Sequence, residues 1–217
     1  MTLFLLFFIP LTAVFILRVF FRESFYRSDT WLVAFRGLLA FLISILPIYI
    51  IIQSYGVKYV RSALYFRFLL ADFLILLLPL LLFYFFWERR KIEYEYGQRL
   101  FIHIFAFVNG YFALIGVFAG FLHFGFYSGY RLFGYPLLLM LADLSVILGL
   151  YLYSAGGDWK RYVSFVLVLA VLVLSAFVPF LIQLSYIFWG TFSCLFLSFS
   201  AVGVLYLLYR KRIIPTE

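Results

Sequence analysis

Long apolar runs, separated by short charged or polar stretches, are the dominant pattern of this chain. Within each run the hydrophobic residues continue for about twenty positions, without the alternation of apolar and polar residues that marks a half-buried strand. A helix needs about 20 apolar residues to cross the hydrocarbon core of a membrane, whereas a strand of a membrane barrel would alternate. The pattern therefore predicts membrane-spanning helices.

Seven runs are long enough to be such helices. We predict spans at about residues 3–21, 32–53, 66–87, 100–122, 133–153, 162–183 and 186–209. The connections between them are short, which favours antiparallel neighbours in a compact bundle. We expect an all-α fold, with one polytopic transmembrane domain covering residues 1–217. The first run has no basic segment before it and no small-residue cleavage site, so we expect a retained span and not a signal peptide.

Composition supports this fold class and leaves little space for anything else. Of the 217 residues, 67% are hydrophobic and 12% are charged, about half the charged share of a typical soluble domain. The mean hydropathy is +1.13. No sizeable soluble domain fits between the runs. Cys194 is the only cysteine, so the chain cannot form an internal disulfide.

The basic residues predict which way the bundle faces. With the N-terminus outside and the C-terminus in the cytosol, the outer side carries four basic residues, Lys58, Arg61, Arg67 and Arg131. The cytosolic side then carries thirteen, namely Arg18, Arg22, Arg27, Arg36, Arg89, Arg90, Lys91, Arg99, Lys160, Arg161, Arg210, Lys211 and Arg212. This excess is typical of cytosolic loops. It also favours an odd number of spans, because with one span fewer the basic residues would be divided between the two sides.

The net charge of +8 does not indicate nucleic-acid binding. Its basic residues lie at the ends of apolar runs, where they set topology and contact anionic lipid headgroups, so membrane lipids are the expected partners. Segment 88–99 is the longest predicted cytosolic connection. It is either a solvated charged loop or the docking surface of a cytosolic partner, and further membrane subunits are a second class of partner.

Two acidic residues lie within predicted spans and are the main candidates for a functional site. Asp72 lies in the third span and Asp143 in the fifth, each with apolar neighbours along its own helix. An intramembrane carboxylate needs a partner, a proton or a path to water. The alternatives are a structural ion pair or hydrogen bond with another helix, a proton or cation site, and a catalytic pair. Partners for the structural alternative would be Arg61, Arg67, Arg131 or Gln183.

The fourth span carries a stripe of small and polar residues at helical spacing. Its members are Ala106, Asn109, Ala113, Gly116, Gly120 and His123. Small residues let a second helix approach closely, so the stripe predicts a packing face across which Asn109 forms a hydrogen bond. A ligand path along it is the alternative. Asn109 and His123 therefore join Asp72 and Asp143 in the candidate intramembrane polar site.

Motifs for cofactors, metals and common enzyme chemistry are lacking in the sequence. His103 and His123 are the only histidines, and about 30 Å of helix separates them, so together they cannot ligate one haem iron. The chain has no phosphate-binding glycine loop and no hydrolase signature. We therefore expect no cofactor and no metal site.

These observations favour a transport-type component of a plasma membrane, and we expect a prokaryotic one. It would be a small permease or the membrane subunit of a larger transporter. The first alternative is a structural or assembly subunit of a membrane complex. The second is an intramembrane hydrolase that uses Asp143 with Asp72 or His123; an enzyme is otherwise not expected.

Overall fold

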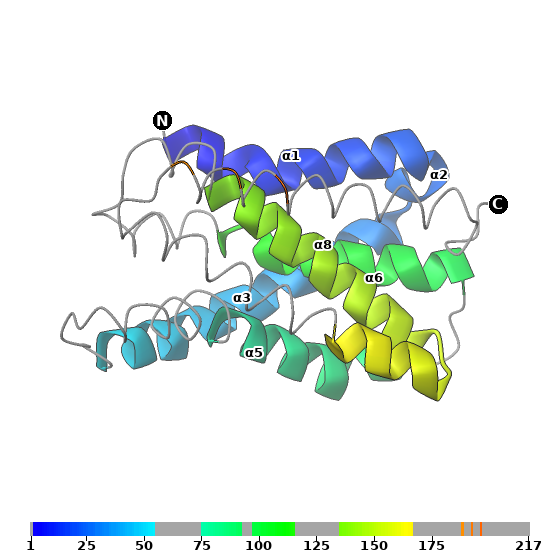
Figure 1. Cartoon of the computed structure of the whole chain (residues 1–217). Coiled ribbons are helices and arrows are strands. Elements are labelled where there is room, and N and C mark those ends of the chain that lie inside the picture. The colour runs from blue at the N-terminus through cyan, green and yellow to red at the C-terminus, as the bar shows by residue number, and fades with distance from the viewer. Residues whose placement is uncertain are drawn as a thin grey trace.

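Helices form every described element of the chain (Figure 1). The structure is a computed structural model, and it describes residues 2–54, 75–92, 97–115 and 135–166, with residues 188, 192 and 196. The helices are α1 (Thr2–Phe20), α2 (Arg22–Phe25), α3 (Ser28–Ser54), α5 (Ile75–Phe83), α6 (Gly97–Phe112) and α8 (Tyr135–Ser154). A π-helical turn, η2 (Tyr84–Glu88), and a 3-10 turn, η3 (Arg89–Lys91), extend α5. The all-α prediction is confirmed for these residues.

The helix boundaries lie close to the predicted ones wherever both are described. α1, α3 and α8 match the predicted spans 3–21, 32–53 and 133–153 to within about four residues. The third and fourth predicted spans are described only from residue 75 and up to residue 115, and the sixth only as a helix over residues 158–166. The last span, 186–209, lies almost wholly outside the described residues. A bundle of seven spans therefore stays a prediction.

Length and apolarity together mark one described helix as able to cross a membrane. It covers Ser28–Pro47, within α3. Two further apolar helices, Pro10–Phe20 and Ala142–Ser154, are shorter. The part of the chain that the structure describes thus contains one candidate span.

The closest helix packing joins α3 to α6. A Cβ atom added to Gly37 would overlap the backbone carbonyl of Phe107, and one added to Gly110 would overlap the backbone of Ala34. The two glycines therefore lie where the two backbones nearly touch, an arrangement that only residues without a side chain allow. The predicted small-residue stripe names other residues, and its members from Gly116 onward lie outside the described part of the chain.

α6 is the centre of the core. It packs against α3, α8 and α1, and almost all of its residues from Leu100 to Phe112 are buried. Aromatic rings fill the contacts edge to face: Phe41 and Tyr111 lie 5.3 Å apart between centroids, and Phe101 and Tyr151 lie 5.5 Å apart. Such edge contacts suit the ring quadrupoles and add to the energy of burial.

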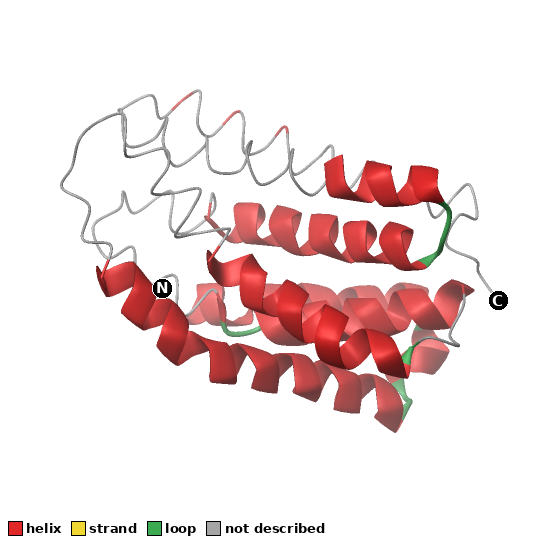
Figure 2. Ribbon diagram, turned by 90° about the horizontal axis from the view of Figure 1, so that it is seen from below, coloured by secondary structure: helices red, strands yellow, loops and turns green. Residues whose placement is uncertain are grey.

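Three connections meet at one end of the bundle (Figures 1 and 2). They are the α1–α3 connection, the segment after α5, and the turn after α8, where Gly156 and Gly157 have φ of 87° and 88°. Contacts join them: the Arg89 guanidinium lies 5.2 Å from the ring centroid of Tyr153. The sequence assigns all three connections to the cytosolic side, and we call this the polar end.

Candidate functional site

Asp143 lies in the buried middle of α8, within an unbroken buried stretch from Ala142 to Tyr151. Its side chain is 3% exposed. The Oδ1 atom has no hydrogen-bond partner among the described residues. A carboxylate oxygen in such surroundings normally takes a donor, a cation or a proton, because ionised oxygens lose their hydration on burial. Asp143 is thus buried within α8 and has acceptor capacity to spare.

The proposed partners of Asp143 lie outside the described residues. This holds for Asp72 and His123, and for the cationic and amide residues named as structural partners, Arg61, Arg67, Arg131 and Gln183. Neither a paired carboxylate site nor a structural ion pair at Asp143 is therefore tested. No cluster of three potential metal ligands occurs in the described ranges.

Asn109 is buried on α6, but its hydrogen bond stays within its own helix. Its Nδ2 donates to the carbonyl oxygen of Phe105 at 2.9 Å, one turn earlier. The small-residue stripe predicts a bond across the helix seam, and the local carbonyl takes the donor because it is already in reach. The described residues show no hydrogen bond between Asn109 and Asp143.

The main polar cluster of the described structure is built around Glu88, a residue that the sequence patterns do not single out. Glu88 is fully buried, and its Oε1 lies 2.8 Å from Nη1 of Arg36 and 2.8 Å from Nε2 of His103. Its Oε2 lies 3.6 Å from Nζ of Lys91. The cluster therefore ties α3, η2, η3 and α6 together at the polar end.

This arrangement separates the first residue of segment 88–99 from the solvated loop that the sequence suggests. Its first residue is a fully buried carboxylate, while Arg89, Arg90 and Lys91 remain exposed. The π-helical turn over Tyr84–Glu88 accounts for the change, because an added residue in a helical turn rotates the following side chains to a different face. A signal was available in the sequence: Arg36 lies inside a predicted span, where an arginine needs an acidic partner.

The charges around Glu88 decide its ionisation. Burial alone would raise the pKa of the Glu88 carboxyl. The hydrogen bond donated by His103 and the positive charges of Arg36 and Lys91 outweigh burial, so the pKa of Glu88 is lowered below its ordinary value. Glu88 is therefore an ionised acceptor at neutral pH. Because Glu88 is ionised and already paired with Arg36 and His103, it suits a structural role better than proton exchange.

Cationic and aromatic side chains surround this cluster at the polar end. Arg89 and Arg161 both lie over the ring of Tyr153, at 5.2 and 5.7 Å from its centroid, and Lys91 lies 5.1 Å from that of Trp87. These cation–π contacts hold positive charge next to the half-buried ring of Tyr153 and the exposed ring of Trp87. Such a combination of residues is typical of a membrane–water interface.

Comparisons with known proteins add no assignment: no family model, no curated protein and no solved structure matches this chain.

Proposed function

We propose that this chain is a multi-pass membrane protein of the transport type, with Asp143 as an intramembrane site for a proton or a small cation. The observation that carries the proposal is the buried carboxylate of Asp143, whose Oδ1 has no protein donor among the described residues. A proton or a cation would balance the charge of such a group, and would be exchanged when the site opens to water.

The outer surface of the bundle supports a membrane location. Large apolar side chains of α1 and α3 point outward, with Phe15, Ile43 and Leu46 each more than 60% exposed. A soluble monomer rarely exposes a broad apolar face, whereas lipid would cover one at no cost. Trp87 and Trp159, both exposed at the polar end, suit the headgroup region.

The gathering of charge at one end supports the proposed orientation. Arg27 and Arg99 line one pocket at the polar end, and Arg89 and Arg161 lie over the same Tyr153 ring there. A positive end of this kind faces the cytosol in plasma-membrane proteins. We place the polar end in the cytosol and the N-terminus outside, in a prokaryotic plasma membrane.

The test compares Asp143→Asn with Asp158→Asn, an exposed carboxylate in the connection after α8. Each protein is reconstituted in liposomes that contain a pH-sensitive dye, and ion entry is driven by an imposed membrane potential. We expect wild type and Asp158→Asn to show equal proton or sodium entry. Asp143→Asn should lose at least nine-tenths of it, because the amide cannot carry the exchanged charge.

Labelling by a hydrophobic carbodiimide, which attacks protonated carboxyls in apolar surroundings, then tests the site itself. Peptide mass spectrometry should find the adduct at Asp143, with less labelling as pH rises or sodium is added. Equal ion entry in wild type and Asp143→Asn, or no labelling of Asp143 at any pH, contradicts the proposal.

A structural or assembly subunit is the second candidate, and the Glu88 cluster favours it. There the polar side chains join helices and leave an exposed, aromatic-rich end. Under this alternative Asp143→Asn changes the free energy of unfolding and leaves ion entry absent in every variant.

A further inference from the structure

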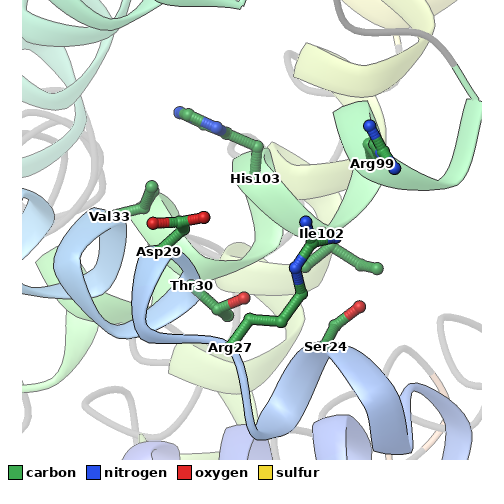
Figure 3. Close-up of a pocket in the computed structure, with 8 residues that line it drawn as sticks. All are labelled: Ser24, Arg27, Asp29, Thr30, Val33, Arg99, Ile102 and His103. Atoms are coloured by element: carbon green, nitrogen blue, oxygen red, sulfur yellow. The ribbon is translucent and has the colours of Figure 1, made fainter.

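A pocket at the polar end lies between the α2–α3 turn and the first turns of α6 (Figure 3). Its volume is about 120 Å³. The pocket is separate from Asp143 in the middle of α8, so the ligand that it binds is independent of the function proposed for that residue.

The polar lining of the pocket includes two cations and two hydroxyls, beside Asp29 and His103. Arg27 and Arg99 contribute guanidinium groups, and Ser24 and Thr30 contribute hydroxyls. Both arginines are exposed, and neither forms an ion pair within the described part of the chain. Two guanidinium groups around one hollow, against the single carboxylate of Asp29, attract a negative group.

The two hydroxyl residues are almost completely buried, yet their hydroxyls remain available. Ser24 and Thr30 are each 7% exposed, and neither side chain has a hydrogen-bond partner among the described residues. Figure 3 shows the Thr30 hydroxyl oxygen directed toward the Arg27 side chain, and the Ser24 hydroxyl oxygen directed to the side where Arg99 lies. The two hydroxyl oxygens are accessible from the pocket, so both hydroxyls can donate to a ligand with acceptor oxygens.

The wall that carries these groups is held in place before any ligand arrives. The backbone N–H of Arg27 donates to the carbonyl oxygen of Ser24 at 3.2 Å, and Nε1 of Trp31 donates to the carbonyl oxygen of Phe25 at 2.8 Å. The Phe25 and Trp31 rings also pack edge to face at 5.5 Å. The turn leads into α3, whose free first-turn N–H groups and dipole favour a negative group.

One acidic residue, Asp29, also lines the pocket. Figure 3 shows its carboxylate on the side of Val33, across Thr30 from Arg27. His103, at the same edge, is already bonded to Glu88. The positive side of the pocket is therefore the side of Ser24, Arg27 and Arg99, and a ligand with several acceptor oxygens on one small group fits it best.

We infer that this pocket binds a phosphate group, with Arg27 and Arg99 as its charge partners and Ser24 and Thr30 as its hydroxyl donors. The phosphate is that of an anionic lipid headgroup in the cytosolic leaflet or that of a soluble phosphate compound. Two arginines with donors on short side chains match the tetrahedral oxygens of this group.

The experiment uses the full chain in nanodiscs that contain either phosphatidylglycerol with phosphatidylcholine or phosphatidylcholine alone. Native mass spectrometry counts the anionic lipids that stay bound after release. Inorganic phosphate, added to the detergent-solubilised chain at constant ionic strength against chloride, is tested by the rise in Tm. Three variants are compared with wild type. One combines Arg27→Gln and Arg99→Gln, the second is Thr30→Val, and the third, Arg90→Gln, is an exposed basic control at the same end.

We expect the double arginine variant to lose at least about tenfold in bound phosphatidylglycerol or in phosphate affinity, since charge-assisted hydrogen bonds are lost. Thr30→Val should lower the same binding a few-fold. This variant gives an independent result if the double arginine variant folds poorly. Arg90→Gln should match wild type. A loss confined to the lipid identifies a headgroup site, and a loss that includes inorganic phosphate identifies a site for soluble phosphate. Equal binding by wild type, Thr30→Val and the double variant overturns the inference.

Discussion

The carboxylate of Glu88 is stable out of contact with water because an arginine, a lysine and a histidine surround it. An isolated ionised carboxylate in an apolar interior would cost many kcal/mol, and each hydrogen bond to the charged carboxylate returns about 1.5–3 kcal/mol. Oε1 receives two such bonds at 2.8 Å, from Arg36 and His103. The balance is favourable only while all of these partners remain, so the cluster is sensitive to the loss of any one of them.

Glu88→Gln should therefore lower the free energy of unfolding by about 2 kcal/mol or more, because Arg36 loses its counter-charge. The pKa of Glu88 is lowered in the folded protein, so its contribution is fully present above the unfolded pKa of about 4.3. It is lost as pH falls through the folded pKa. Chemical unfolding in detergent from pH 7 to pH 3 should show this acid loss in wild type and not in the variant.

A matched control breaks the exposed pair between Arg161 and Asp158, whose atoms lie 3.8 Å apart. Asp158→Asn should cost less than about 1 kcal/mol because water screens the pair. If Glu88→Gln unfolds like Asp158→Asn at neutral pH, the Glu88 cluster contributes no stability.

At the level of single residues, the sequence predicts which residues lie in apolar helices better than it predicts which side chains contact each other. Asp143 lies in a helix, α8, as the apolar run around it predicts, because hydropathy is a local property. The Glu88 cluster joins residues 15 and 52 positions apart in the chain, and a π-helical turn selects the face. A short stretch of sequence encodes neither these long-range contacts nor the π-helical turn. Only the position of Arg36 inside a predicted span indicates that an acidic partner is needed.

At the scale of helices, two glycines set how closely α3 and α6 approach. Gly37 and Gly110 each remove the side chain where a backbone carbonyl of the other helix lies. Close approach increases the dispersion contact between the helices, which is the main attraction available where no water is displaced. The aromatic rings of Phe41 and Tyr111 then pack beside this contact.

Gly37→Ala and Gly110→Ala should each destabilise the protein by about 2 kcal/mol. An alanine gains about 1 kcal/mol of helix propensity, and a methyl group forced against backbone costs about 3 kcal/mol because the backbone cannot move aside. Thermal unfolding in detergent gives the comparison. Gly156→Ala, with φ of 87° and open space around it, should lose only about 1–2 kcal/mol from strain. Unchanged Tm in both helix variants would show that the two helices separate without cost.

Helix positions follow from the sequence, but the residues at helix contacts do not. The apolar runs place α1, α3 and α8 correctly, since about twenty apolar residues leave few alternatives to a helix. The small-residue stripe predicts the right helix, α6, for close packing. It does not select Gly110, because six small or polar residues in one helix allow several faces and the partner helix decides among them.

At the scale of the whole molecule, the connections predicted to be cytosolic can be placed, whereas the predicted outer side lies outside the described residues. Connections assigned to one side by their basic residues do lie at one end, where the Glu88 cluster, the cation–π contacts and the phosphate pocket are found. The apolar flanks of α1 and α3 lead away from that end. Among the described residues, charge thus gathers at the polar end, as the proposed cytosolic orientation requires.

Cysteine accessibility in intact bacterial cells would decide whether the chain crosses the membrane several times with its polar end in the cytosol. In a Cys194→Ser background, single cysteines are placed at Arg90 and Asp158, and at Lys58 and Arg131 on the predicted outer side. A membrane-impermeant maleimide should label positions 58 and 131 in intact cells, and positions 90 and 158 only after the membrane is opened. Labelling of all four in intact cells, or of 90 and 158 on different sides, would contradict a multi-pass protein with its polar end in the cytosol.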